Sequence, residues 1–365
     1  MNDNDDKGFK SYMLYTIAWI AALAVERAAA EAMLDEQHEE PLDFVHNPSD
    51  ANEYTWGRMG VHNIVIASLP AGIYGTTAAA TTAAHLASSL PHIKIGVLVG
   101  IAGAIPQLKT AKDANGAVIE TVDKHLDIRL GDVVVGRPEG TSGGVVQYDL
   151  GKSKLGQVWE RKGSLNAPPH VLLAALSRLQ SEHRKGNYKI PGFLEKMLAD
   201  YPSMAKPRLA KDVPYTHQGY SHDILFQADY GHLEGESDCS NCEVAYRITR
   251  QERETTDPDI HYGIIASGNT LVKDAFTRDK ISQSTGERCI CYEMEAAGIV
   301  SYFPCLVIRG ICDYADSHKN DRWQPYASAT AAAFAKELLF YCSLKKLRVE
   351  VPLGEISSRM YSNSM

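Results

Sequence analysis

The sequence has no long hydrophobic run and no excess of positive charge. Its most apolar N-terminal stretch, residues 12–25, is shorter than the ~20 residues that a membrane-spanning helix needs, and it runs directly into charged residues. Residues 21–24 loosely match a signal-peptide cleavage site, but the acidic segment 2–7 is the wrong start for a signal peptide. The net charge is −8, whereas binding to a nucleic-acid backbone needs clustered Lys and Arg. We therefore expect a cytoplasmic protein that binds neither membranes nor nucleic acid.

Signatures of cofactor and metal sites are also scarce. The glycine-containing turn at residues 69–77 has neither the Lys-Ser/Thr ending of a P-loop nor the spacing of a dinucleotide fingerprint. Seven cysteines are an odd number, and most lie in expected core strands, which indicates reduced, buried thiols. Cys239 and Cys242 form one CxxC, but a structural zinc site generally takes four ligands, and only His222 and His232 lie nearby. We expect a plain surface turn there, with a metal site as the alternative, and no cofactor.

The chain does contain a repeated pattern of a buried strand followed by a helix. Expected strands cover residues 15–23, 64–67, 95–104, 127–135, 260–269 and 306–311, and expected helices cover residues 26–34, 76–89 and 325–344. This alternation predicts an α/β fold. We expect one three-layer α/β/α domain with a mixed central sheet over residues 12–345, with loose tails at 1–11 and 350–365.

Residues 137–258 differ in composition and are predicted to be a long insertion within this domain. They hold clusters of Gly, Pro and charge, with helix candidates at 169–183 and 192–201. Three arginines, Arg247, Arg250 and Arg253, follow at three-residue spacing. A solvated face is the default interpretation of that row, and a contact with an anion is the alternative. The insertion could cover a pocket or form an oligomer contact.

Carboxylates stand at the predicted ends of several elements. Glu26 follows the first strand, Asp313 ends the strand over residues 306–311, and Glu293 and Glu295 open what is expected to be a helix. Acids at a helix N-terminus meet the positive end of the helix dipole, and ligands of open α/β sheets bind at the carboxyl ends of strands. Acids that converge from distant segments are what glycosyl cleavage needs, with one group protonating the leaving group and another activating water.

At these positions the chain resembles the nucleoside phosphorylase/nucleosidase superfamily. The resemblance is strongest to its 5′-methylthioadenosine/S-adenosylhomocysteine nucleosidase branch, and it extends to the phosphorylase-like head domain of fungal NOD-like receptors. The matching segments are residues 17–26 (IAWIAALAVE), 99–103 (VGIAG), 130–134 (LGDVV), 267–269 (SGN), 293–296 (EMEA) and 309–313 (RGICD) with 315–316 (AD). They cover about residues 13–136 and 260–345 in family order.

The resemblance implies roles for individual residues. Glu26 matches the acid that activates water, and Asp313 matches the acid that protonates or hydrogen-bonds the purine N7. Glu295 matches the carboxylate that binds the ribose 2′- and 3′-hydroxyls. The further implied substrate-binding positions are Ile101, Ala102, Gly103, Asn269, Leu271, Val272, Glu293, Met294 and Trp323, the last near the 5′ end of the sugar.

Departures from the family pattern bear on the reaction. Phosphorylases carry an Arg just before the glycine turn, where this chain has Leu98. Without that Arg a buried phosphate dianion would be costly to desolvate, so hydrolysis is favoured over phosphorolysis. Ile101 and Cys312 replace family serines, and residues 317–323 are polar where thioether-accepting enzymes are apolar. The polar segment favours a 5′-hydroxyl, or a 5′-phosphate, over a methylthio group.

These observations predict a purine nucleoside hydrolase that cleaves the N9–C1′ bond, with adenosine as the favoured substrate and free base and ribose as products. A phosphorylase or a nucleotide N-glycosidase is the alternative on the same fold. A domain that binds a nucleoside without turnover is the alternative from another class. A homo-oligomer, with a dimer favoured, is expected.

Overall fold

A computed structural model describes residues 11–112, 118–122, 126–152, 155 and 160–356 of the chain. Its centre is a ten-stranded mixed sheet in which nine strands follow the order β13-β12-β8-β14-β5-β1-β4-β3-β2, and β9 pairs with β12. The strands of this sheet are β1 (Tyr15–Ala21), β2 (Glu36–His38), β3 (Tyr54–Met59), β4 (His62–Ser68), β5 (Ile95–Ala104), β8 (Val133–Gly136), β9 (Val145–Gln147), β12 (Ile260–Ser267), β13 (Cys289–Glu293) and β14 (Cys305–Asp313). Two small hairpins complete the strands, β6 (Leu108–Lys112) with β7 (Val118–Val122), and β10 (Gly151–Lys152) with β11 (Glu160–Arg161).

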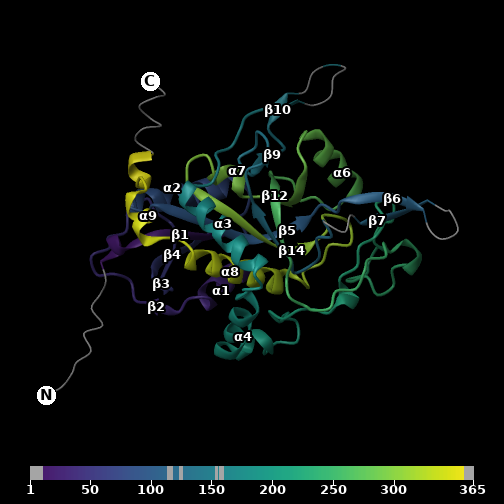
Figure 1. The fold of residues 1–365 in the computed structure, drawn as a ribbon, viewed down its shortest axis with the longest axis horizontal. Coiled ribbons are helices and arrows are strands. Elements are labelled where there is room, and N and C mark those ends of the chain that lie inside the picture. The colour runs from purple at the N-terminus through teal and green to yellow at the C-terminus, as the bar shows by residue number, and fades with distance from the viewer. Residues whose placement is uncertain (1–10, 113–117, 123–125, 153–154, 156–159, 357–365) are drawn as a thin grey trace.

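Helices lie on both faces of the sheet (Figure 1). They are α1 (Ala24–Ala32), α2 (Thr76–Ser89), α3 (His170–Arg184), α4 (Ile190–Asp200), α5 (Pro202–Ala205), α6 (Ala275–Ser284), α7 (Ala296–Ile299), α8 (Gln324–Phe340) and α9 (Leu344–Val349). Helices α1, α3 and α4 all pack against α8, which lies on β14 and β5, whereas α2 packs against α7. The predicted three-layer architecture with a mixed sheet is therefore confirmed.

The middle of the sheet is built from β1, β5 and β14, whose side chains are almost all buried. These three strands are mutually parallel neighbours, so their carboxyl ends lie at one edge of the sheet. A register shift between Ile311 and Asp313 places Asp313 beside Gly103 of β5. Strand β13 then pairs antiparallel with β5 at Gly103 and Ala104, which folds the sheet back on itself beside that edge.

The insertion contributes to the core. Helix α8 is buried along nearly its whole length, because α1 covers one part and the insertion helices α3 and α4 cover another. Its Glu337 is fully buried and lies 3.2 Å from His183 of α3. Its Lys336 donates to the Met33 carbonyl and to Asp35, both at 2.7 Å. The polar groups of this helix are thus paired with protein groups on two sides.

Two local predictions were wrong. Glu293 does not open a helix: it ends β13, a strand that the sequence reasoning missed, and Glu295 precedes the four-residue helix α7. The arginine row is not a solvated face either. Arg250 and Arg253 are largely buried. Arg250 pairs with Asp223 within the insertion at 3.0 Å, and Arg253 pairs with Asp132 at 2.6 Å, which ties the end of the insertion to the start of β8.

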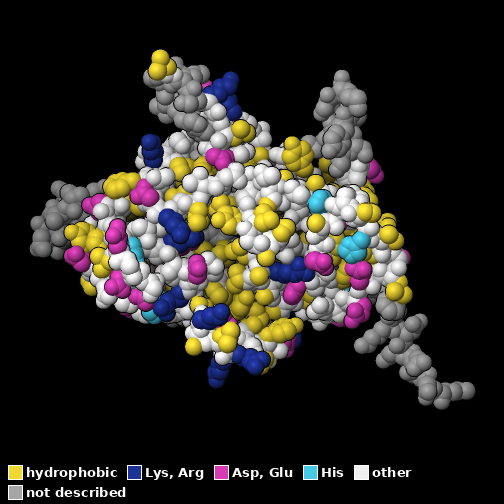
Figure 2. All heavy atoms as spheres, turned by 180° about the vertical axis from the view of Figure 1, so that it is seen from behind, with side chains coloured by type: hydrophobic (Ala, Val, Ile, Leu, Met, Phe, Trp, Pro, Cys, Tyr) yellow, Lys and Arg dark blue, Asp and Glu magenta, His cyan; other side chains and the backbone are white. Residues whose placement is uncertain are grey.

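On the face shown in Figure 2, cationic and anionic side chains are interspersed with hydrophobic ones. Within the described residues, none of the helices combines the length and the apolar character that crossing a bilayer requires.

Candidate active site

Glu26 lies at the start of α1 with its carboxylate turned back onto the backbone. One oxygen accepts the amides of Ala22 and Leu23 at 2.6 and 2.9 Å, and the other accepts the amide of Ile101 in β5 at 2.8 Å. The side chain is 4% exposed. Burial raises the pKa of Glu26 above its ordinary value, and Arg309 and the three amides offset only part of that rise. The result is a fixed carboxylate that can hold a proton at higher pH than a free glutamate.

A second cluster of charge surrounds Arg309, which is fully buried in β14. Its guanidinium donates to Glu293 in a short contact and to Glu295 at 3.3 Å. Glu293 also accepts the amides of Glu295 and Ala296, the closest of these contacts being 2.9 Å from Ala296. Glu293 therefore caps the start of α7 while it holds the arginine, which leaves the Glu295 carboxylate as the less engaged member of the pair.

Glu295 is the titratable member of this cluster. Burial raises the pKa of Glu295 to about 7, with Glu293 and Glu26 adding to the rise and Arg309 opposing it. Its other contact is with the Gly75 amide at 3.4 Å, at the start of α2. Burial is thus the main cause of the raised Glu295 pKa, and repulsion from the carboxylates of Glu293 and Glu26 adds to it.

Gly100 makes the proximity of these groups possible. A methyl group at this position would overlap both the Glu26 carboxylate and the guanidinium of Arg309. The two Arg309 nitrogens that do not bind Glu293 or Glu295, Nε and Nη1, are buried and have no hydrogen-bond partner among the described residues. The cluster thus presents unused donors next to its carboxylates.

Asp313 also lies beside β5, at Gly103, which is three residues further along this strand than Gly100. A side chain on Gly103 would overlap its carboxylate. One Asp313 oxygen accepts the Ala315 amide at 2.8 Å, and the other accepts Lys319 in a short ion pair and the Cys312 thiol at 3.1 Å. Ala315 has a φ of +50°, a strained value for a residue other than glycine, and such strain concentrates at functional sites.

A small cavity of about 120 Å³ opens beside Asp313. Its walls come from the end of β14 and the loop that follows it, and from the last part of the insertion. The lining residues are Leu130, Ser221, His222, Ile224, Asp238, Cys239, Ser240, Arg247, Cys312, Asp313, Tyr314, Asp316, His318, Asn320 and Arg322. Two arginines and two histidines therefore face the same space as the predicted acid.

A larger cavity of about 850 Å³ lies elsewhere, at the start of β12, and none of the four predicted acids lines it. Several of the arginines around it, including Arg129, Arg250 and Arg253, are already paired with aspartates. The smaller cavity is the better candidate because it contains Asp313.

The loop after β12 carries other predicted substrate-binding residues. Asn269 accepts the amide and hydroxyl of Thr76, both at 3.0 Å, and thereby joins this loop to the start of α2 near Glu295. Leu271 is 45% exposed, whereas Val272 is buried in the second core cluster. Ala102 is buried in β5, and Met294 is half-buried between Glu293 and Glu295. Asn269 and Met294 therefore lie close to Glu295, whereas the places of Leu271 and Val272 in a substrate site stay predictions.

Trp323 lies at the start of α8 and is fully buried. Its indole donates to the His222 carbonyl at 3.1 Å, and its ring meets those of His217 and Tyr326 edge-on. It supports the wall that His222 forms and is absent from the residues lining the cavity. Its assigned place near the 5′ end of the sugar stays a prediction.

Sequence reasoning missed two groups of this site, Arg309 and Lys319. Arg309 was noted only as part of a matching segment, although an arginine inside a buried strand must have acidic partners, and Glu293 and Glu295 were the available ones. Lys319 gave no comparable signal, because its contact with Asp313 depends on the path of the loop after β14.

Comparisons with known proteins show what the chain is similar to. No family model matches the chain. A nucleotide-binding leucine-rich repeat (NLR)-like protein of the fungus Hyaloscypha variabilis is 38% identical over 349 residues, which are 94% of this chain and 31% of that protein. The chain thus spans about a third of that relative's length. An ATP nucleosidase, Cap17, of Escherichia coli is 34% identical over 80 residues, which are 20% of this chain and 16% of that protein.

Solved structures settle the fold. The 5′-methylthioadenosine/S-adenosylhomocysteine nucleosidase of Neisseria meningitidis superposes with a TM-score of 0.52 at 17% identity, over 89% of this chain and 99% of that one. Futalosine hydrolase of Helicobacter pylori gives 0.53 at 15% identity, over 90% and 99%. This chain has the nucleosidase fold, which is nucleoside phosphorylase-like. The predicted resemblance is confirmed at that level.

Proposed function

We propose that the chain hydrolyses the N-glycosidic bond of a purine nucleoside, with adenosine favoured. The observation that carries the proposal is the convergence of three acids on the end of β5. Glu26 accepts a hydrogen bond from the Ile101 amide, and Asp313 lies over Gly103. Glu295 is paired with Arg309, whose guanidinium lies next to Glu26 at Gly100. We assign Glu26, Glu295 and Asp313 the roles of base, sugar ligand and acid, and of these three only Asp313 lines the cavity.

Glu26 is the group that activates water. A general base works best when its pKa lies near the operating pH, and burial shifts Glu26 in that direction. Three backbone amides fix the carboxylate, so that it can accept a proton from a water molecule without losing its orientation. The neighbouring Arg309 stabilises the charged form between turnovers.

Asp313 and Lys319 act at the leaving base. The departing purine needs a proton or a hydrogen bond at N7, and Asp313 is the carboxyl group that faces the cavity. Lys319 holds one of its oxygens in the free protein. We infer that the bound purine displaces Lys319 from this contact, that Asp313 then takes up a proton, and that it donates this proton to N7 as the N9–C1′ bond breaks.

Glu295 binds the sugar. An ionised carboxylate accepts hydrogen bonds from both hydroxyls of a ribose diol. A pKa of about 7 means that this acceptor form is populated only in part at neutral pH. Only Nη2 of Arg309 is engaged by Glu293 and Glu295, but the carboxylates around the guanidinium would repel a phosphate dianion, and this supports water rather than phosphate as the nucleophile.

A second candidate substrate is a 5′-phosphorylated purine nucleotide. The specific observation is the cavity beside Asp313, where Arg247, Arg322 and His222 line the wall. Arginine is well suited to bind phosphate oxygens. The 80-residue match to an ATP nucleosidase supports the same candidate.

One assay tests both candidates. Purified protein is incubated with adenosine, AMP, ATP, inosine and guanosine, with and without phosphate, and the products are separated by chromatography. Free adenine with ribose, or with the ribose phosphate, is the expected result and is independent of phosphate. Ribose 1-phosphate formed only with phosphate would overturn hydrolysis in favour of phosphorolysis. Saturable binding without any product, measured by calorimetry, would instead identify a nucleoside-sensing domain.

A further inference from the structure

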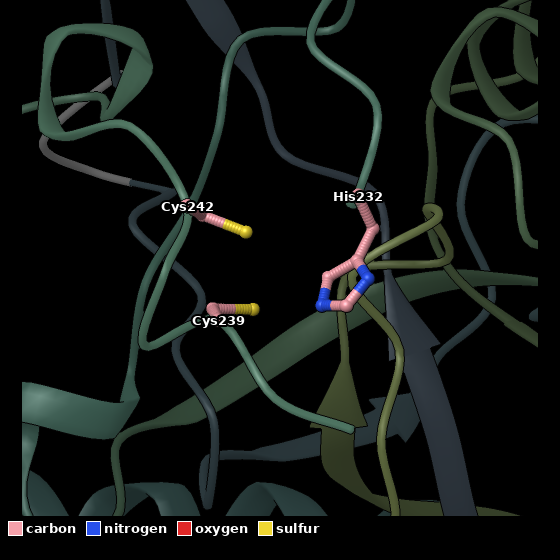
Figure 3. Close-up of side chains that lie close together, drawn as sticks. All are labelled: His232, Cys239 and Cys242. Atoms are coloured by element: carbon pink, nitrogen blue, oxygen red, sulfur yellow. The ribbon is translucent and has the colours of Figure 1, made fainter. Parts of the chain in front are cut away.

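The insertion brings two thiols and an imidazole together. One ligand atom each of His232, Cys239 and Cys242 lies within 4.8 Å of the others (Figure 3). The imidazole points toward the two sulfur atoms, which face the same gap from one turn of chain. Both cysteines are free thiols. His222, the other histidine near the CxxC in sequence, is not part of this group and lines the cavity beside Asp313.

Backbone hydrogen bonds hold this arrangement. The Cys242 amide donates to the Cys239 carbonyl at 3.2 Å, which closes the CxxC turn so that both sulfurs lie on one side. His232 Nε2 lies 3.0 Å from the Asp238 carbonyl, and an ion bound through this nitrogen would replace that contact. The His232 amide in turn donates to Ser317 at 3.0 Å, in the loop after β14.

We propose that His232, Cys239 and Cys242 bind a thiophilic divalent metal ion of the zinc class. Two thiolates and one imidazole match the ligand preferences of Zn²⁺, and the C-x-x-C spacing places both sulfurs on one ion. Binding releases the two thiol protons, and no oxidation or reduction takes place. A metal site here would replace the plain surface turn with two thiols that the sequence leads us to expect.

A fourth side chain, His318, lies next to His232 of this group. His318 is 7% exposed, and neither of its ring nitrogens has a hydrogen-bond partner among the described residues. Its ring centre lies 5.4 Å from that of His232. A buried imidazole without a partner is unusual, and a small movement of His318 toward His232 would let it serve as the fourth ligand of a tetrahedral set.

The position of the ion gives it a consequence for the active site. Cys239 and His318 line the same cavity as Asp313. The loop after β14 carries Ser317 and His318 on the metal side and Lys319 against Asp313. The ion would therefore fasten the insertion to the loop that positions the predicted acid. The metal site does not depend on the proposed function, although it would support the loop that this function uses.

Metal content tests the site directly and without reference to activity. The full chain is dialysed against metal-free buffer, and zinc is measured by mass spectrometry. About one zinc per chain is expected, as for a single three- or four-ligand site. Cys239→Ser, Cys242→Ser and His232→Gln should each reduce it at least about tenfold. The matched control, Cys342→Ser, replaces a buried cysteine far from the cluster and should keep the metal.

A second readout covers variants that fold poorly. Wild-type protein stripped with a chelator and reloaded with Co²⁺ should show a sulfur-to-cobalt charge-transfer band, and stripping should lower the melting temperature reversibly. Wild-type protein that neither retains zinc nor gives this band with Co²⁺ would overturn the proposal. So would a Cys239–Cys242 disulfide found by thiol titration in freshly prepared protein, or full zinc retention in all three ligand variants.

Discussion

The Glu26 carboxylate and the Arg309 guanidinium occupy the space where Gly100 has no side chain. Because Glu26 is buried and held by three amides, and Glu295 is held by Arg309, their charges are fixed relative to the end of β5. Single-atom changes at these positions alter chemistry without altering shape. The residue scale is therefore where the proposed roles are tested most cleanly.

Glu26→Gln and Asp313→Asn should each lower kcat by about 10²–10⁴, since each removes a group that moves a proton in the reaction. Release of free adenine is the measurement. Glu195→Gln, on the exposed side of α4, is the control and should match wild type. Wild-type rates in both site variants would exclude these two carboxyl groups as the acid and base.

Glu295 should impose a pH dependence on substrate use. Its carboxylate form accepts the ribose hydroxyls, so kcat/KM should rise as pH increases through about 7. Glu295→Gln should raise KM and abolish this limb. A limb that persists in the variant would assign the titration to another group.

The same shift has a consequence for stability. The folded pKa of Glu295 is about 7 and the unfolded value is near 4.5. Between these values the folded chain binds more protons than the unfolded chain, so its contribution to stability falls as pH rises from about 4.5 to 7. Urea unfolding of wild type and Glu295→Gln across that range measures it, and the variant should show the flatter profile. An identical slope in both proteins would contradict the shift.

The residues of the site were predictable only in part. Glu26, Glu295 and Asp313 follow strong local patterns, so their positions at element ends could be anticipated. The β13 strand could not be anticipated in this way, because its five residues, CICYE, end on Glu293, and the Glu-x-Glu pair that begins there resembles the start of a helix. The Lys319 contact depends on the conformation of a loop, and no periodicity encodes that.

At the scale of elements, the contact between β14 and α8 sets where Asp313 lies. Gly310 of β14 faces the backbone of Ala327 in α8, and a methyl group there would overlap the Ala327 carbonyl. The helix can therefore approach the strand closely. Any separation of the two would move Asp313 relative to β5.

Gly310→Ala should destabilise the protein by at least about 2 kcal/mol, because backbone on both sides leaves no side chain that can rotate away. The matched control is Gly192→Ala. Gly192 lies within α4 with nothing near its missing side chain, so alanine should stabilise it by up to about 1 kcal/mol. Chemical denaturation gives both values. Equal effects would show that the close approach does not matter.

At the scale of the whole molecule, the insertion is a structural part of the domain. Helices α3 and α4 cover α8, and the end of the insertion is joined to β8 by Arg253 and Asp132. The sequence indicated both helices to within two residues of their start and end, since each has an apolar stripe. It gave no indication of what they cover, because α8 is apolar on all sides and offers no preferred face.

Two adjacent alanines of α3 test this role. Ala175 is buried on the side of α3 that faces the core, whereas Ala174 is exposed. Ala175→Asp should cost about 3–5 kcal/mol, as for an unpaired buried charge. Ala174→Asp should stay within about 0.5 kcal/mol of wild type. Thermal unfolding distinguishes them, and a tolerated Ala175→Asp would show that the insertion is dispensable for the core.

Neither helix α8 nor strand β14 has a solvent-exposed face. The ten residues that connect them, from Tyr314 to Trp323, thus form a loop whose two ends are held by buried elements. Entry of the proposed purine to Asp313 therefore requires movement of that loop or of the insertion residues that line the same cavity, and release of Lys319 from Asp313 is the smallest such movement.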